Sequence, residues 1–330
     1  MLLDILDTFD VSKFRIRKQD PNEYSPVVVR PRSSTETKKH SRKTRDSIPQ
    51  RVLLTLGEVP KWYDINPFIL TGYRHQTNSL LGCLASWTYV HNESGNIYSH
   101  LIPAVAAIFG HRLLYNYLRA EYANLRDKDW TIISLQLWAA LACMSTSTMY
   151  HTMICHSPKV KHNCLMYDYV GIIAVMLGNF ISGIYFGFYC EPRLRLTYWI
   201  LVTTMSLATG VVMLNRRFHG PKWRRFRMNC FLLTGFFASA PMVHGTIRWG
   251  REFVRKTGVR YYLLEVLLIL VGCFFYERRL PERLFPGRFD IWWHSHTIWH
   301  LFVVGAVAMH LVGTLTAFDY DYHHRSVCYA

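Results

Sequence analysis

Three histidines within seven residues have the spacing in this chain that most directly indicates chemistry. They belong to the stretch HSHTIWH, residues 294–300, which opens a long apolar run. On a helix, residues four apart share a face with Cβ atoms ~5–6 Å apart, so His296 and His300 can bind one metal ion. Zinc held by this pair needs a third ligand from elsewhere in the chain, and an open position if it is to do chemistry. The nearby His294 falls outside the pair.

Two other apolar segments carry polar residues that could complete such a site. The stretch STSTMYHTMICH places Ser147 four residues before His151, and MYDYVGI contains Asp168. Ionisable groups inside a membrane span are costly and indicate function. The remaining histidines of the apolar segments are expected to serve only as packing or hydrogen-bonding groups: His100, His111, His244 and His310.

Seven apolar segments must position these residues. Each approaches the ~20 residues that a helix needs to cross a ~30 Å hydrocarbon layer. Lipid offers backbone amides no hydrogen-bond partners, and the alternation typical of a β-barrel is not visible, so we expect helices. The sequence therefore predicts an all-α, multi-pass integral membrane protein of the plasma membrane or an endomembrane, with a seven-transmembrane helix bundle. The segments are about 97–118, 130–154, 166–189, 196–215, 228–247, 261–277 and 294–316.

The distribution of positive charge gives an orientation. With the N-terminus inside, the inner loops hold twelve Lys and Arg and the outer loops hold ten. This small excess favours a cytosolic N-terminus and an extracellular or lumenal C-terminus. In that topology the inner ends of the second, third and seventh helices lie at one depth. The polar residues expected at this level are Ser147, His151, Asp168, His296 and His300.

The polar N-terminal region differs from the rest of the chain. Residues 1–96 are expected to be cytosolic, with 1–57 disordered and 58–96 forming a short juxtamembrane helix on the bilayer surface, because this part is rich in aromatics and leucines. The seven-helix bundle is assigned to 97–316. Residues 317–330 are expected to form a short extracellular or lumenal tail.

Charge and cysteine content exclude some classes of function. The net charge is +16, but many bases lie in short loops between apolar runs, and no nucleic-acid-binding motif is found. No nucleic-acid partner is therefore expected. The eight cysteines are dispersed and form no CxxC pair, which argues against a disulfide framework or a cysteine zinc site. Most are expected to be small buried hydrophobic residues.

Five ordered motifs resemble the progestin and adipoQ receptor family, and most closely its adiponectin receptor-like and fungal haemolysin III-related branch. The resemblance covers roughly residues 58–316. The family also resembles membrane hydrolases such as the alkaline ceramidases. The motifs are ESGNIYSHL (93–101), STMYHTMICHSPKV (147–160), DYVGI (168–172), RLPERLFPGRFDIW (279–292) and SHTIWHLFVV (295–304).

The resemblance implies seven helices with the N-terminus inside and a bound zinc ion. By motif, the zinc ligands are His151, His296 and His300. The family's third-helix aspartate, here Asp168, is implied to hold a zinc-bound water, and Ser147 lies beside the site. The family motif formed by Glu93, Asn96 and His100 is also present, but the sequence assigns these residues no role.

Several functions remain open at this stage. A three-histidine zinc site has one open position, where a water can become nucleophilic near neutral pH. Asp168 could then act as a general base and acid, and Ser147 could stabilise the oxyanion. This predicts a zinc-dependent hydrolase of membrane lipid amides such as ceramide, linked to signalling and to lipid and zinc homeostasis. The alternatives are a receptor for an extracellular protein ligand with a structural zinc, and a proton or ion transporter.

Overall fold

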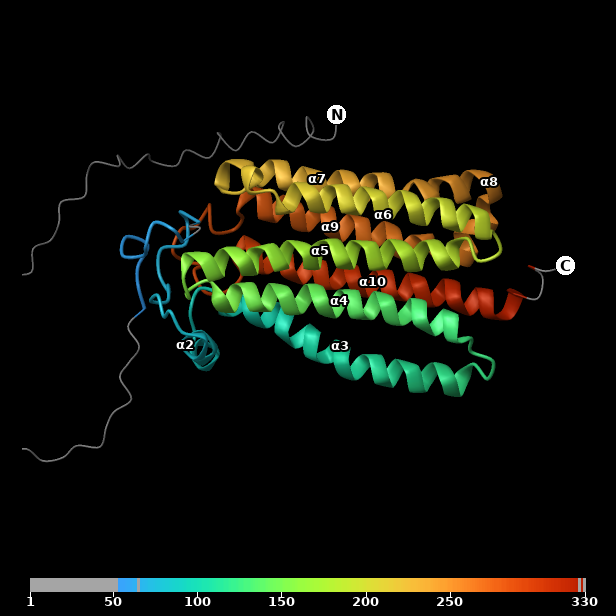
Figure 1. Cartoon of the computed structure of the whole chain (residues 1–330), viewed down its shortest axis with the longest axis horizontal. Coiled ribbons are helices and arrows are strands. Elements are labelled where there is room, and N and C mark those ends of the chain that lie inside the picture. Colours follow the sequence, from blue (N-terminus) through green and yellow to red (C-terminus); the bar gives the residue numbers. More distant parts are fainter. Residues whose placement is uncertain (1–52, 64–65, 326–327, 329–330) are drawn as a thin grey trace, which may run out of the picture. The chain divides into compact units, whose positions relative to one another are not determined.

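The computed structural model describes residues 53–63, 66–325 and 328, and within them seven helical spans are long and apolar enough to cross a membrane, as predicted. The spans run side by side along one axis (Figure 1). All but one are single helices. They are α3 (Ser94–Glu121), α4 (Asp127–Met153), α5 (Pro158–Gly187), α6 (Pro192–Leu214), a fifth span made of α7 (Arg224–Ala238) and α8 (Ala240–Thr257), α9 (Val259–Arg278) and α10 (Ser295–His324).

The fifth span is broken between α7 and α8. Pro241 follows the break and has no backbone N–H, so it cannot donate to the carbonyl four residues earlier. The backbone N–H of Ser239 instead bonds to the carbonyl of Phe236 at 3.1 Å. A second kink lies within α8 at Gly250, whose φ is 59°, so the span crosses the bundle as a series of shorter helical pieces.

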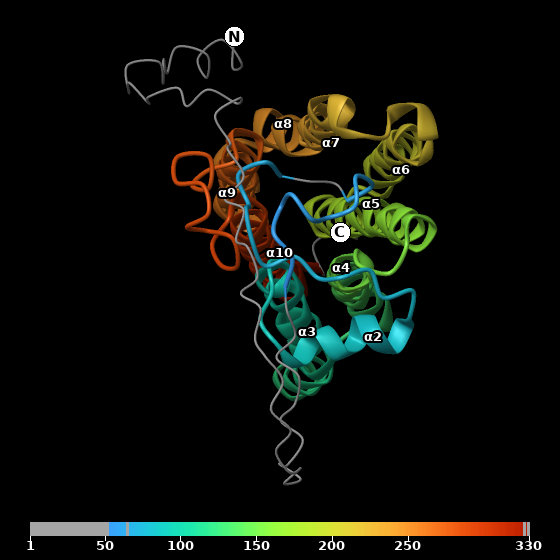
Figure 2. The same ribbon diagram turned by 90° about the vertical axis from the view of Figure 1, so that its left-hand side faces the viewer.

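The last helix, α10, is central to the bundle. It contacts α3, α4, α5, α8 and α9, and in the end view it lies between α9 and α4 (Figure 2). Its first residue is fixed by the fully buried carboxylate of Glu282, which accepts hydrogen bonds from the backbone N–H of Ser295 at 2.8 Å and from its hydroxyl. An anionic group at a helix N-terminus is stabilising. The first turns of α10, which carry His296 and His300, are therefore held in place.

This helix continues beyond the predicted end of the seventh span at residue 316. It runs to His324, so most of the predicted tail 317–330 is helical. A helix satisfies its own backbone hydrogen bonds and can leave the apolar layer without interruption. Side chains anchor the extension, since the hydroxyl of Tyr122 donates to Asp319 at 2.8 Å and Asp321 is buried.

Residues 53–63 and 66–93 form an irregular cap at the end of the bundle where α4 ends and α10 begins. Of the predicted juxtamembrane helix 58–96, only α2 (Leu80–Ala85) and the 3-10 turn Ser86–Thr88 are helical before α3. Long-range bonds hold the rest, including the backbone N–H of Leu70 to Asp290 at 3.0 Å. The predicted disordered region 1–57 lies outside the described residues except for 53–57, where Leu54 pairs with Tyr73.

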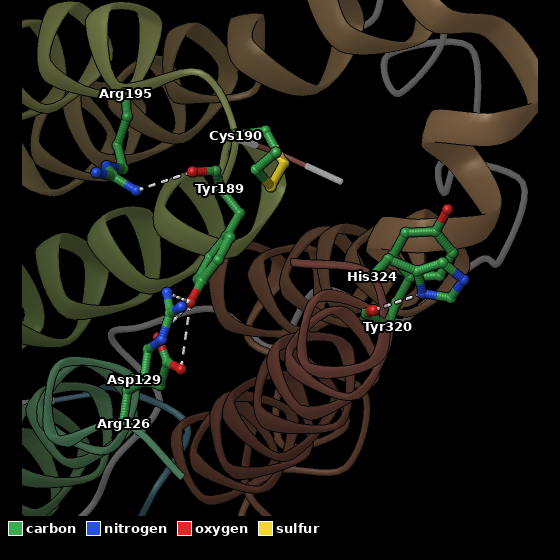
Figure 3. The surroundings of a disulfide bond; sticks show 8 residues. Arg126, Asp129, Tyr189, Cys190, Arg195, Tyr320 and His324 are labelled. Atoms are coloured by element: carbon green, nitrogen blue, oxygen red, sulfur yellow. Dashed lines mark hydrogen bonds between the residues drawn. A yellow bond between two sulfur atoms is a disulfide. The ribbon is translucent and has the colours of Figure 1, made fainter. Parts of the chain in front are cut away.

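The opposite end of the bundle carries a disulfide bond between Cys190 and Cys328, which are 138 residues apart in the chain. The sequence predicted no disulfide framework, and so distant a pair leaves no local spacing signal. Beside the bond, Tyr189 donates to Asp129 at 3.2 Å and accepts from Arg126 at 3.2 Å (Figure 3). Five of the six free cysteines are buried, as expected.

Candidate metal centre

Three histidines from two helices meet at the capped end of the bundle. His151 lies in the last turn of α4, and His296 and His300 lie in the first two turns of α10. One ring nitrogen from each lies within 4.8 Å of the others, and Nε2 of His151 is 3.1 Å from Nε2 of His296. Three nitrogens placed ~2.0–2.1 Å from a tetrahedral zinc ion would be about 3.3 Å apart, so the cluster approaches that geometry.

Hydrogen bonds fix the orientation of two of these rings. Nδ1 of His151 lies 2.8 Å from Oε2 of Glu93, and Nδ1 of His300 lies 3.2 Å from the carbonyl oxygen of Asn96 and 3.0 Å from the hydroxyl of Ser99. A carboxylate and a carbonyl accept only, so both Nδ1 atoms carry a proton, and in the neutral form of each ring Nε2 has the lone pair. Such partners commonly orient metal-binding histidines.

The cluster therefore fits a metal ion. Nε2 lone pairs that face each other at about 3 Å repel unless a proton or a cation lies between them. Bulk water has little access to these rings, since His151 and His300 are only 2% and 3% exposed. A group of three imidazoles with neutral, inward-facing nitrogens is the donor set that zinc prefers. It is the one such group among residues 53–63, 66–325 and 328.

Glu93 is the main charged neighbour of the cluster. Its Oε2 accepts from His151 and from Nδ2 of Asn96 at 2.7 Å. Burial opposes ionisation of this carboxyl, but the hydrogen bond from His151, the positive charge of Arg74 and the hydrogen bond from Asn96 hold its pKa below its usual range. Glu93 is therefore an anion that places a negative charge beside the imidazole of His151.

Asn96 joins the two helices that carry the ligands. Its Nδ2 donates to Glu93, its Oδ1 accepts from the hydroxyl of Thr297 at 2.8 Å, and its carbonyl oxygen binds His300. One residue of α3 thus supports both the α4 and the α10 side of the cluster. Glu93, Asn96 and His100 have the spacing i, i+3 and i+7, which places them on one face of a helix.

His100 packs directly on a candidate ligand. Its ring stacks on that of His300 with centroids 3.8 Å apart and planes 10° apart. It is 3% exposed, and neither ring nitrogen has a hydrogen-bond partner among the described residues. The sequence placed His100 with the ordinary packing histidines, whereas the structure places it in the wall of the candidate metal centre.

Ser147 shares a face of α4 with His151. It is 2% exposed, and its hydroxyl has no hydrogen-bond partner within the described part of the chain. A buried hydroxyl without a partner costs free energy, so Ser147, one turn from a candidate ligand, has a hydroxyl available to a water or a ligand group.

Asp168 lies on α5 beside the cluster but outside the trio. Its partly buried carboxylate interacts electrostatically with His151. The close approach of α5 to α4 depends on Gly171, where an added Cβ would lie 2.2 Å from the hydroxyl of Thr146 and 3.0 Å from the Cα of Cys143. Because Gly171 is three residues after Asp168, the same contact brings the carboxylate towards the histidines.

Two residues outside the helices also support the site. The guanidinium of Arg74 donates to the carbonyl oxygens of His151 at 2.6 Å and Thr152 at 3.0 Å, which caps the end of α4. His294 lies outside the cluster, as predicted, and its Nε2 is 3.3 Å from the carbonyl oxygen of Asn92. The contribution of Arg74 has no sequence signal, because it depends on the folding of the cap.

Comparison with known proteins agrees with this architecture. The Haemolysin-III related family model matches residues 88–311. The chain is 31% identical over 305 residues to ADIPOR-like receptor IZH2 of Saccharomyces cerevisiae, covering 89% of this chain and 96% of that protein. It is 31% identical to heptahelical transmembrane protein 1 of Arabidopsis thaliana, covering 84% of each chain. It is 30% identical to human progestin and adipoQ receptor family member 3, covering 84% of this chain and 88% of that one.

The matched region contains all seven spans except the last part of α10, and it includes the three clustered histidines, Ser147 and Asp168. The predicted resemblance is therefore confirmed over most of the chain. This protein is an integral, multi-pass membrane protein that belongs to the Haemolysin-III related family, among its adiponectin receptor-like members.

Proposed function

We propose that this chain is a zinc-dependent hydrolase that cleaves the amide bond of a ceramide-like membrane lipid, and so links lipid turnover to signalling and to zinc homeostasis. The observation that carries the proposal is the convergence of His151, His296 and His300, with Nδ1 of two rings occupied by Glu93 and Asn96. A zinc ion held there would lower the pKa of water and polarise a carbonyl group.

The surrounding residues supply the remaining chemistry. Amide hydrolysis adds the oxygen of water to the carbonyl carbon, breaks the C–N bond and leaves a fatty acid and an amine. Asp168 would accept the proton that water loses and deliver it to the departing nitrogen. The unpaired hydroxyl of Ser147 would donate to the oxygen that becomes negative in the transition state.

The position of the site suits a substrate that lies in the bilayer. The histidines lie near the ends of helices that are long and apolar enough to cross a membrane, and the amide of a lipid would lie near the same ends, just below its headgroup. A lipid amide could therefore reach the site without leaving the membrane. This argument supports a lipid over a soluble amide, and ceramide is the simplest lipid with the required bond.

The test combines metal analysis with turnover. Purified wild-type protein should contain about one zinc per chain and should release fatty acid from one member of a panel of lipid amides. His296→Ala and His300→Ala should lose both zinc and turnover, and Asp168→Asn should lose turnover alone. His244→Ala is the matched control, because this histidine bonds to Tyr198 on the other side of the bundle. Turnover that persists in the zinc-free variants would exclude the proposal.

A receptor with a structural zinc is the second candidate, because the yeast relative is named as a receptor. In that case zinc would tie α4 to α10 and stabilise one arrangement of the bundle. The two candidates predict different results for Asp168→Asn, which should abolish turnover only if the chain is a hydrolase. If the wild-type protein binds zinc and cleaves none of the lipid amides, while saturable binding of an extracellular protein depends on the three histidines, the receptor is favoured.

A further inference from the structure

A strongly basic pocket lies apart from the histidine cluster, at the same end of the bundle. Its volume is about 360 Å³. Two segments far apart in the sequence form most of its wall: the turn that leads into α7, and the end of α9 with the loop that follows. The lining residues are Phe68, Pro221, Lys222, Arg224, Arg225, Glu277, Arg278, Arg279 and Arg283.

The pocket holds six cationic side chains and one carboxylate. Glu277 is shared, since it accepts from Arg224 at 3.0 Å and from Arg225. Arg224 is further held by the carbonyl oxygens of Glu277 at 2.8 Å and Tyr276 at 3.1 Å. The lining side chains together carry a net charge of +5, and Arg224 is fixed in place by these bonds. A concentration of positive charge in one hollow attracts anions.

The ordinary preference for positive charge on the inner side of a membrane explains only part of this arrangement. That preference concerns the number of Lys and Arg near the ends of the spans, and exposed charges dispersed over the loops would satisfy it. Here two separate loops bring their charges to one hollow, around one shared carboxylate. Arginine binds phosphate through paired N–H groups, so the chemistry of the lining matches a ligand with more than one phosphate.

The neighbouring surface indicates where that phosphate comes from. The loop between α9 and α10 exposes Leu284, Phe285, Trp292 and Trp293, which are 43%, 51%, 46% and 60% accessible. Exposed aromatic and leucine side chains at the end of a membrane span lie at the level of lipid headgroups. Basic pockets between membrane helices at this level suit lipid headgroups.

We propose that this pocket binds the phosphorylated headgroup of an anionic membrane lipid that carries phosphomonoester groups. The acyl chains of the lipid remain in the bilayer beside α7 and α9, and the phosphates contact the arginines and Lys222. The pocket is separated from the histidine cluster by one side chain. The guanidinium of Arg224 lies 4.6 Å from the ring centre of Tyr276, whose ring is 5.5 Å from that of His296.

Binding to the purified full-length protein in detergent tests this proposal. The probes are dioctanoyl phosphatidylinositol bisphosphate, dioctanoyl phosphatidylserine and free inositol trisphosphate. The pocket variant is Lys222→Gln with Arg283→Gln, two exposed residues of the lining. The control is Arg193→Gln with Arg251→Gln, which removes the same charge from exposed positions near the opposite end of the bundle.

Wild-type protein should bind the bisphosphate lipid about tenfold or more tightly than phosphatidylserine, and the pocket variant should lose about tenfold in affinity, because charge-assisted phosphate contacts are strong. The control variant should bind as the wild type does. The proposal is overturned if the pocket variant keeps wild-type affinity or the control loses as much. It is also overturned if inositol trisphosphate binds as tightly as the lipid, since the ligand would then be a soluble phosphate. These measurements do not depend on hydrolysis, so they stand whether or not the proposed enzyme activity is found.

Discussion

The carboxylate of Glu93 should set the zinc affinity of the histidine cluster. In Glu93→Gln, the amide oxygen can take the place of Oε2 and still accept from both His151 and Asn96, because Oε1 is not used in either contact. The variant therefore loses the negative charge and keeps the geometry. A charge-assisted hydrogen bond is roughly twice as strong as a neutral one of about 1 kcal/mol, so we expect a loss of ~1–1.5 kcal/mol, or about tenfold in zinc affinity.

A second substitution separates charge from geometry. Glu93→Ala removes the acceptor and leaves the N–H of His151 buried without a partner, which adds the cost of an unsatisfied group. We expect a loss of about a hundredfold in zinc affinity, the upper end of the range for outer partners of metal ligands. The order of affinity should therefore be wild type, then Glu93→Gln, then Glu93→Ala.

The chain offers a closely matched control. Glu265 contacts Nδ1 of His310 through Oε2 at 2.7 Å and accepts from Asn179 through Oε1 at 3.0 Å, so it has the same two kinds of partner as Glu93 but uses both oxygens. Glu265→Gln loses the charge and one of these bonds, so it should perturb the bundle locally at least as much as Glu93→Gln, without any change in zinc affinity.

Zinc occupancy is measured by elemental analysis after equilibration of purified protein in a series of zinc-buffered solutions. The reasoning is refuted if Glu93→Gln keeps the wild-type midpoint. It is equally refuted if Glu265→Gln shifts the midpoint as far, since the effect would then come from general destabilisation of the bundle.

Three further predictions concern stability. Gly171→Ala should destabilise the protein by about 1–3 kcal/mol, because its Cβ would overlap Thr146, whereas Gly110→Ala meets open space and should not; thermal unfolding compares the two. His91 is buried near Arg74, and its pKa is lowered to about 3. Below about pH 6.5 the imidazole is therefore protonated in the unfolded chain but not in the folded one, so the free energy of unfolding should fall as the pH drops from 6.5 towards 3, by ~2 kcal/mol at pH 5. Melting temperatures at pH 7.5 and 5 should show this loss in the wild type and a smaller one in His91→Gln. Removing the disulfide with Cys190→Ser should cost roughly 2–4 kcal/mol, and a reducing agent should lower the melting temperature of the wild type but not of the variant; equal lowering in both would contradict this.

The spans could be predicted from the sequence because lipid leaves the backbone few alternatives. A run of about 20 apolar residues must be helical to satisfy its amides, whatever its neighbours are. The same reasoning could not place the ends of the helices. α10 continues to His324 through bonds such as that of Tyr122 to Asp319, which depend on how distant helices meet. The irregular cap over 53–63 and 66–93 is likewise held by long-range contacts.

The candidate site divides in the same way. The spacing of His296 and His300 is local, and the alternating direction of the spans was enough to expect His151 at the same depth. Glu93 is 58 residues from His151 in the chain, and no local pattern connects the two. His100 lies on the same face of α3 as Glu93, but its stacking on His300 depends on how α3 crosses α10. Residues on one helix that contact a candidate metal ligand on another helix can be identified only once the packing of the helices is known.

The two Glu–His–Asn groups show what distinguishes a metal centre from a structural polar contact in this bundle. Glu93 with His151 and Glu265 with His310 have nearly equal distances, and each carboxylate also accepts from an asparagine. The difference lies on the other side of each imidazole. Nε2 of His151 faces a second imidazole at 3.1 Å, whereas Nε2 of His310 faces the hydroxyl of Ser182 at 3.4 Å.

The group around His310 has one imidazole and one nearby hydroxyl, and the proton of that Ser182 hydroxyl is donated to the carbonyl oxygen of Asn179 at 3.0 Å. It therefore lacks the second and third imidazole that a three-histidine zinc site needs. His151, in contrast, faces ring nitrogens of His296 and His300, and the three nitrogens lie within 4.8 Å of one another. The group opposite Nε2, and not the presence of a buried histidine–carboxylate pair, is therefore the feature that makes one end of the bundle a candidate metal centre.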